Sequence, residues 1–160
     1  KKYYMHNPLW GKAAWLVATA GVRRWGQRKA VYQFFGLRAN GHQLRSETSK
    51  HKERQEDGTY RVKCGCTDCR VCGAHKETPA KALFACKSMR THRKTFEATV
   101  QANTSSNEWK DWKQQGAKGK WKAVLEWSSG SWEGGEQALQ NILYDLLTLV
   151  HEMYNAREHA

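Results

Sequence analysis

The last part of the chain shows the most regular pattern of apolar residues. Between Ala138 and Met153, apolar residues recur at steps of three and four, which is the spacing of one face of an α-helix. This face consists of Ala138, Leu139, Ile142, Leu143, Leu146, Leu149, Val150 and Met153, widened by Leu147 and Tyr154. The pattern predicts an amphipathic C-terminal helix that packs in a core or docks on a neighbouring subunit.

A second helical pattern occupies the N-terminal part of the chain. Asn7 and Pro8 fit the N-cap and the first position of a helix. Residues at helical spacing follow: Trp10, Ala14, Val17, Gly21, Trp25, Arg28, Tyr32 and Phe35. Glycine weakens a helix interior, and Gly21, Gly26 and Gly36 lie within this stretch. The pattern therefore predicts one basic helix or a helix pair with a break near Gly21 or Gly26.

The middle of the chain predicts shorter elements. Residues 42–58 are almost all polar, which indicates a linker or extended loop, and Tyr60 and Val62 alternate with polar residues as in a short strand. Thr78 and Pro79 fit a helix start before residues 80–90. Further along, we expect Asn107 to cap a helix over residues 108–115, and residues 116–120 to form a flexible basic loop.

These elements predict an α+β chain that is mostly helical. It would contain a basic N-terminal helix or helix pair, a small zinc-stapled module with short strands, and a C-terminal amphipathic helix. We divide it into residues 1–41, a basic helical segment; 42–58, a polar linker; 59–95, a Cys/His metal-binding module; and 96–160, a Trp/Lys-rich segment with the final helix.

The charge of the chain favours a polyanionic partner. It has 27 Lys and Arg against 15 Asp and Glu, a formal net charge of +12. Residues 1–63 hold 14 basic and 4 acidic residues, whereas residues 101–160 hold 6 and 8. We therefore expect RNA to contact the first two-thirds and other protein subunits to contact the C-terminal helix. DNA and an anionic membrane surface are the alternatives. No apolar run reaches the roughly 18 residues of a transmembrane helix.

The cysteines predict a metal centre. Four of them follow the pattern C-x-C-x-x-C-x-x-C, and Cys86 is the fifth. Two residues between thiols allow both sulfurs to reach one ion, and the glycine at position 73 lets backbone amides turn toward a thiolate. The predicted zinc ligands are Cys66, Cys69, Cys72, Cys86 and His92, with Cys64 and His75 as spare ligands. The spacing also resembles that of iron–sulfur clusters, but no proline follows the last cysteine.

Five cysteines, an odd number, do not suit a disulfide framework. We therefore expect a reducing intracellular compartment, which includes the mitochondrial or another organellar matrix, the cytoplasm and the nucleus. The sequence starts with Lys1 rather than Met, which is compatible with removal of a targeting peptide.

Clusters of basic residues are the candidate contacts to nucleic acid. They are Arg23, Arg24, Arg28, Lys29, Arg90, Arg93, Lys94, Lys110 and Lys113. Five tryptophans interleave with lysines in the same region as the last two: Trp109, Trp112, Trp121, Trp127 and Trp132. Such rings stack on unpaired bases or anchor a core, and we favour the core for Trp127 and Trp132.

The sequence contains no serine elbow, no H-E-x-x-H motif and no P-loop, so we do not expect an enzyme. Our leading hypothesis is a zinc-stabilised, non-catalytic RNA-binding structural subunit of a ribonucleoprotein, such as a lineage-specific or organellar ribosomal protein. The alternatives are an accessory structural subunit of a large organellar protein complex and a DNA-binding zinc protein.

Overall fold

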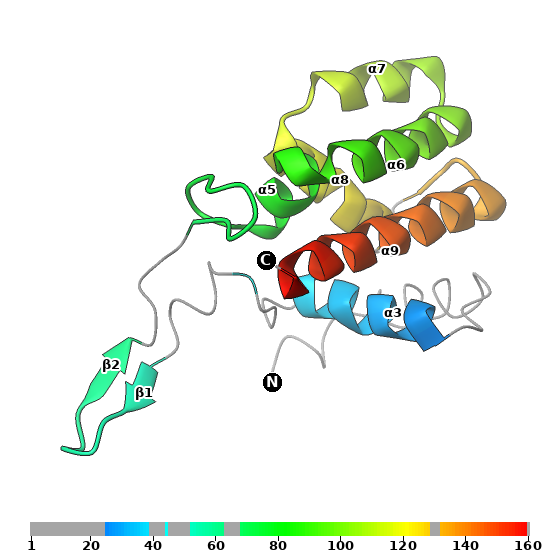
Figure 1. Cartoon of the computed structure of the whole chain (residues 1–160). Helices are drawn as coiled ribbons and strands as arrows, with labels where there is room; N and C mark the ends of the chain where they lie inside the picture. The colour runs from blue at the N-terminus through cyan, green and yellow to red at the C-terminus, as the bar shows by residue number, and fades with distance from the viewer. Residues whose placement is uncertain (1–24, 39–43, 45–51, 63–67, 129–131, 160) are drawn as a thin grey trace.

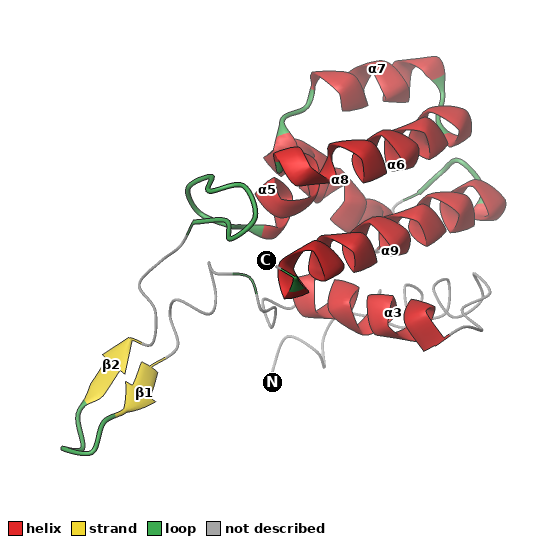
Figure 2. Ribbon diagram, in the orientation of Figure 1, coloured by secondary structure: helices red, strands yellow, loops and turns green. Residues whose placement is uncertain are grey.

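The computed structural model describes residues 25–38, 44, 52–62, 68–128 and 132–159. Most of these residues are helical, and two short strands form a hairpin (Figure 2). The expected mostly helical α+β class agrees with this structure. The helix start predicted at Asn7 lies outside the described residues. Among the described helices, none combines the length and the apolar content that crossing a bilayer requires.

Helix α9, Glu136–Glu158, is the longest described helix and packs against several others. It contacts α3, Trp25–Arg38, and α6, Arg90–Asn103, which lie on either side of it in Figure 1. Its buried residues are Leu139, Ile142, Leu143, Leu146, Leu147, Leu149, Val150, Met153 and Arg157. The predicted apolar face is thus confirmed except for Ala138 and Tyr154, which are only half-buried, and the helix extends beyond it at both ends.

Helix α3 buries a different face from the one that the sequence predicted. Ala30, Phe34 and Leu37 are buried, whereas Tyr32 is 77% exposed. The segment offers apolar residues on more than one side, and contact with α9 selects the side that carries Phe34. The predicted face through Tyr32 is therefore wrong in this helix.

Trp112 lies at the centre of an aromatic cluster between the remaining helices. Its ring meets Phe84 edge-on at 5.8 Å and Phe96 at 6.0 Å, and stacks on Trp127 at 5.1 Å. Trp132 packs edge-on against Trp127 at 5.4 Å. These contacts join α5, Pro79–Phe84, to α7, Ser106–Gln114, and α8, Ala117–Ser128. Trp112 is buried, and the other four tryptophans of this region pack half-buried against the core.

The local boundaries of α7 and α8 differ from the prediction. Ser105, not Asn107, caps α7, and it forms a capping box with Glu108. The stretch predicted as a flexible loop, residues 116–120, belongs mostly to α8. Lys120 explains part of this order, because its Nζ lies 2.6 Å from Glu97 Oε1 and 5.3 Å from the centre of the Trp112 ring.

The helix predicted over residues 80–90 is interrupted at Cys86. Helix α5 ends at Phe84, Cys86 adopts an extended conformation, and a 3-10 turn, η1, covers Lys87–Met89 before α6 begins. Arg93 stabilises the break, since its Nη1 donates to the carbonyl oxygens of Leu83, at 3.3 Å, and Cys86, at 3.0 Å. Because Cys86 is extended, its side chain does not follow the helical spacing of α5.

Strands β1, Lys52–Arg54, and β2, Tyr60–Val62, pair antiparallel, with Arg54 opposite Tyr60. The predicted strand at Tyr60 is confirmed, and β1 lies inside the stretch predicted as a linker. The hairpin extends away from the helices in Figure 1. Its turn includes Gly58 at φ +81°, a conformation that favours glycine.

Candidate metal centre

The loop before α5 has the backbone geometry of a metal-binding knuckle. Gly73 N–H donates to the Cys69 carbonyl at 2.8 Å, and Cys69 N–H donates to the Ala74 carbonyl at 2.8 Å. Gly73 has φ +71°, which only glycine adopts readily. The turn directs the backbone N–H groups of Val71 and Cys72 at the Cys69 sulfur. Donors aimed at a sulfur stabilise the thiolate form, which is the form that binds metals.

Three cysteine sulfurs converge at the junction of this loop with α5 and η1. The sulfurs of Cys69, Cys72 and Cys86 all lie within 4.8 Å of one another, and those of Cys69 and Cys86 are 4.0 Å apart. Two sulfurs on one tetrahedral zinc ion are roughly 3.8 Å apart, because each Zn–S bond is about 2.3 Å long. The spacing therefore fits a shared metal ion. A pocket of about 240 Å³ adjoins the sulfurs, and His75, Lys76 and Lys81 also line it.

The two buried sulfurs differ in acidity. Burial raises the pKa of the Cys69 thiol to about 11, although the surrounding N–H groups and Arg157 act in the opposite direction. Burial also acts to raise the pKa of Cys86, but hydrogen bonds from Ser88 and Cys72 outweigh it, so this pKa is lowered. The Ser88 hydroxyl lies 3.0 Å from the Cys86 sulfur. The thiolate form, which is the form that binds metals, is therefore favoured more at Cys86 than at Cys69.

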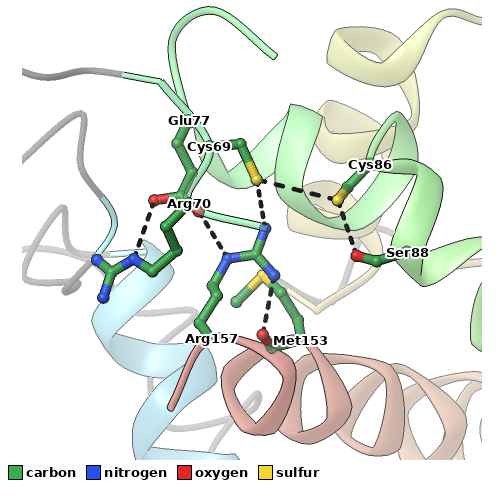
Figure 3. Close-up of polar contacts among 7 residues, drawn as sticks. All are labelled: Cys69, Arg70, Glu77, Cys86, Ser88, Met153 and Arg157. Atoms are coloured by element: carbon green, nitrogen blue, oxygen red, sulfur yellow. Dashed lines mark hydrogen bonds and ion pairs between the residues drawn. The ribbon is translucent and has the colours of Figure 1, made fainter. Parts of the chain in front are cut away.

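A buried arginine joins the knuckle loop to the end of α9 (Figure 3). Arg157 is 4% exposed, and its Nε lies 2.8 Å from Glu77 Oε1. Its Nη1 donates to the Met153 carbonyl at 2.8 Å, and its Nη2 lies 3.6 Å from the Cys69 sulfur. Glu77 is 1% exposed and also faces Arg70, whose Nε is 4.0 Å from Oε2. The guanidinium therefore neutralises a buried carboxylate and presents a positive charge to the sulfur of a candidate metal ligand.

The structure brings together three of the five predicted metal ligands. Cys66, like the spare ligand Cys64, lies outside the described residues. His92 is exposed in the first turn of α6 and does not join the three sulfurs. His75 lines the adjoining pocket, and its Nδ1 lies 2.8 Å from Asp68 Oδ1, but it is not part of the group. Three cysteines can therefore hold a metal ion, and the choice of the fourth ligand stays a prediction.

The predicted nucleic-acid residues lie in different surroundings, and their contact with nucleic acid stays a prediction. The Nζ of Lys29 lies 3.1 Å from Glu158 Oε1. Arg93 donates a hydrogen bond to the Cys86 carbonyl. The Nζ of Lys113 lies 5.6 Å from the centre of the Trp109 ring. The side chains of Arg90, Lys94 and Lys110 are exposed. Arg23 and Arg24 lie outside the described residues, and Arg28 belongs to α3.

Sequence reasoning missed Arg157, Glu77 and Ser88. Each belongs to a residue type that is common on protein surfaces, and Arg157 is 88 positions from Cys69. No local spacing links these residues to the cysteines. One signal was present, because an arginine near the end of an otherwise apolar helical face is unusual unless it has a buried partner.

Comparisons with protein-family models, with characterised proteins and with solved structures give no match to this chain. The arguments for its function therefore come from its own residues.

We expect Cys72→Ser and Cys86→Ser each to lower the metal content of the purified protein well below that of the wild type, because each removes one of three converging sulfurs. His92→Ala tests whether this residue is the fourth ligand, and the exposed Thr91→Ala is the control, which should retain the wild-type metal content. Elemental analysis by mass spectrometry gives the metal-to-protein ratio. Unchanged ratios in both serine variants would show that the metal binds elsewhere.

We expect Arg157→Met to lower the free energy of unfolding by about 3–5 kcal/mol, because it removes the closer of the two arginine partners of the fully buried Glu77 carboxylate. The double variant Glu77→Met/Arg157→Met should be closer to wild type, since it removes both charges. Urea unfolding of the metal-loaded proteins measures these differences.

Lys29→Met is the matched control, because it breaks an ion pair at the same end of α9 whose side chains are 47% and 51% exposed. An exposed pair contributes about 0–1 kcal/mol. If Arg157→Met lowers the free energy of unfolding no more than Lys29→Met does, the buried pair does not stabilise the junction.

Proposed function

We propose that the chain is a zinc-stabilised, non-catalytic RNA-binding protein that serves as a structural subunit of a ribonucleoprotein. The observation that carries the proposal is the convergence of the Cys69, Cys72 and Cys86 sulfurs where the knuckle loop meets the helices. A metal ion at this point would join the knuckle loop to α5 and η1. Structural zinc sites contribute folding free energy in this way.

The chemistry of the site favours zinc. Thiolates at tetrahedral spacing select zinc or iron–sulfur clusters among the common metal centres. The Cys69 and Cys86 sulfurs, 4.0 Å apart, are close to the separation expected for two ligands of one zinc ion. Both are buried, as in a closed structural site. We propose a reducing compartment for the protein, because the thiols must stay free to bind the metal.

RNA is the proposed partner because of charge. A net charge of +12 in 160 residues suits a phosphate backbone, and several basic side chains of the helices are exposed. The tryptophans do not add to this argument, since Trp112 is buried and the other four pack against the core. Phosphate contacts, rather than a tryptophan platform for bases, would therefore supply the affinity.

The core role of the tryptophans favours a second candidate. In an accessory structural subunit of a large protein complex, the metal and the aromatic cluster would be scaffolding. The charge would then have no RNA partner.

We expect zinc-loaded protein to bind a labelled structured RNA with an affinity that falls steeply as salt rises from 50 to 200 mM, because phosphate contacts release counterions. Removing zinc with a chelator should unfold the module, weaken binding and lower the helical circular dichroism signal. Fluorescence anisotropy and mass spectrometry of the metal provide the measurements. Absence of RNA binding at 50 mM salt by fully zinc-loaded protein would contradict the RNA role and favour the second candidate.

A further inference from the structure

The outer surface of the metal module is unusually basic. Residues 68–94 contain seven basic side chains: Arg70, Lys76, Lys81, Lys87, Arg90, Arg93 and Lys94. All of them except Arg93 are exposed. The same segment has two acidic residues, Asp68 and Glu77. The balance of charge at this surface therefore depends on where these two carboxylates point.

Neither carboxylate pairs with Lys87, Arg90 or Lys94. The side chain of Glu77 is fully buried, Arg157 pairs with it from the interior at 2.8 Å, and Arg70 Nε lies 4.0 Å from its Oε2. Asp68 contacts His75, whose Nδ1 is 2.8 Å from its Oδ1. The interior arginine thus neutralises one of the two acids, and the segment keeps an excess of basic residues.

Three of the cations follow one another along η1 and α6. Lys87, Arg90 and Lys94 are spaced by three and four residues, which places them on one side of this helical segment. None of the three forms an ion pair with another residue of the described chain. Lys87 also directly follows Cys86, one of the three candidate metal ligands. The row therefore begins beside the candidate metal centre.

The exposed lysines of α7 and α8 share these helices with acidic residues. Lys110, Lys113, Lys118 and Lys122 lie on the same two helices as Glu108, Asp111 and Glu126. The Nζ of Lys122 lies 3.7 Å from Oε1 of Glu126, one helical turn further along α8. On α3, Lys29 pairs with Glu158. The excess of basic over acidic residues is therefore larger in residues 68–94 than in α3 or in α7 and α8 together.

We propose that the exterior of the metal module, centred on Lys87, Arg90 and Lys94, is the surface that contacts the phosphate backbone of RNA. A phosphate chain suits this surface better than a membrane does, because membrane-surface helices need exposed apolar residues. Here Leu83, Phe84 and Met89 are buried. The metal centre therefore orders the binding surface in addition to joining the loop to the helices.

This inference rests on the proposed function, and one pair of variants separates the two. Lys87→Gln/Lys94→Gln removes two charges from the module, and Lys118→Gln/Lys122→Gln removes two charges from α8, so both have the same net charge. Both should retain wild-type zinc content and helical signal. Binding of a fluorescein-labelled RNA hairpin is measured by anisotropy between 50 and 300 mM KCl, beside a DNA duplex and phosphatidylserine vesicles.

The slope of log affinity against log salt should fall by about two in the module variant, roughly one for each lost phosphate contact, and by less than one in the α8 variant. Equal effects of the two variants, or a larger effect of the α8 variant, would overturn the inference while RNA binding itself stands. Tighter binding to the DNA duplex or to the vesicles would overturn the choice of RNA. Wild-type protein that binds no RNA would refute the proposed function itself.

Discussion

The junction between the knuckle loop and helix α9 depends on the buried guanidinium of Arg157. It lies within hydrogen-bonding distance of the Glu77 carboxylate, the Met153 carbonyl and the Cys69 sulfur. A buried charge is costly unless it is compensated, so each of these groups requires the others. Because α9 also packs on α3 and α6, the position of Cys69 is coupled to the helical core. The loop, the sulfurs and the last turn of α9 therefore form one unit.

The sequence predicts the parts of this unit that follow a local rule. The apolar repeat of α9 and the spacing of Cys69 and Cys72 depend on neighbours within a few residues. The ion pair between Arg157 and Glu77 spans 80 positions and leaves no such pattern. Tertiary contacts also explain why two predictions made from local sequence were wrong. The packing of α9 selected Phe34 rather than Tyr32 as the buried ring, and the residues predicted as a loop became helical in α8, where Lys120 contacts Glu97 and Trp112.

The metal module has an inner side and an outer side with different chemistry. On the inner side, three sulfurs, a carboxylate and a guanidinium are packed against helices. On the outer side, lysines and arginines are exposed. Arg157 neutralises Glu77 from within, while Lys87, Arg90 and Lys94 on the outer side form no ion pair with the described residues. In the proposed function, the centre that stabilises the fold also positions the surface that meets RNA, and the tryptophans serve the core.

The central claim is that the three cysteine sulfurs bind one metal ion, which we propose is zinc. X-ray absorption at the zinc edge of the zinc-loaded protein tests it most directly, because sulfur and nitrogen or oxygen ligands give different distances, about 2.3 Å and about 2.0–2.2 Å. We predict at least three sulfur ligands at about 2.3 Å. A first shell composed only of nitrogen and oxygen would contradict the claim.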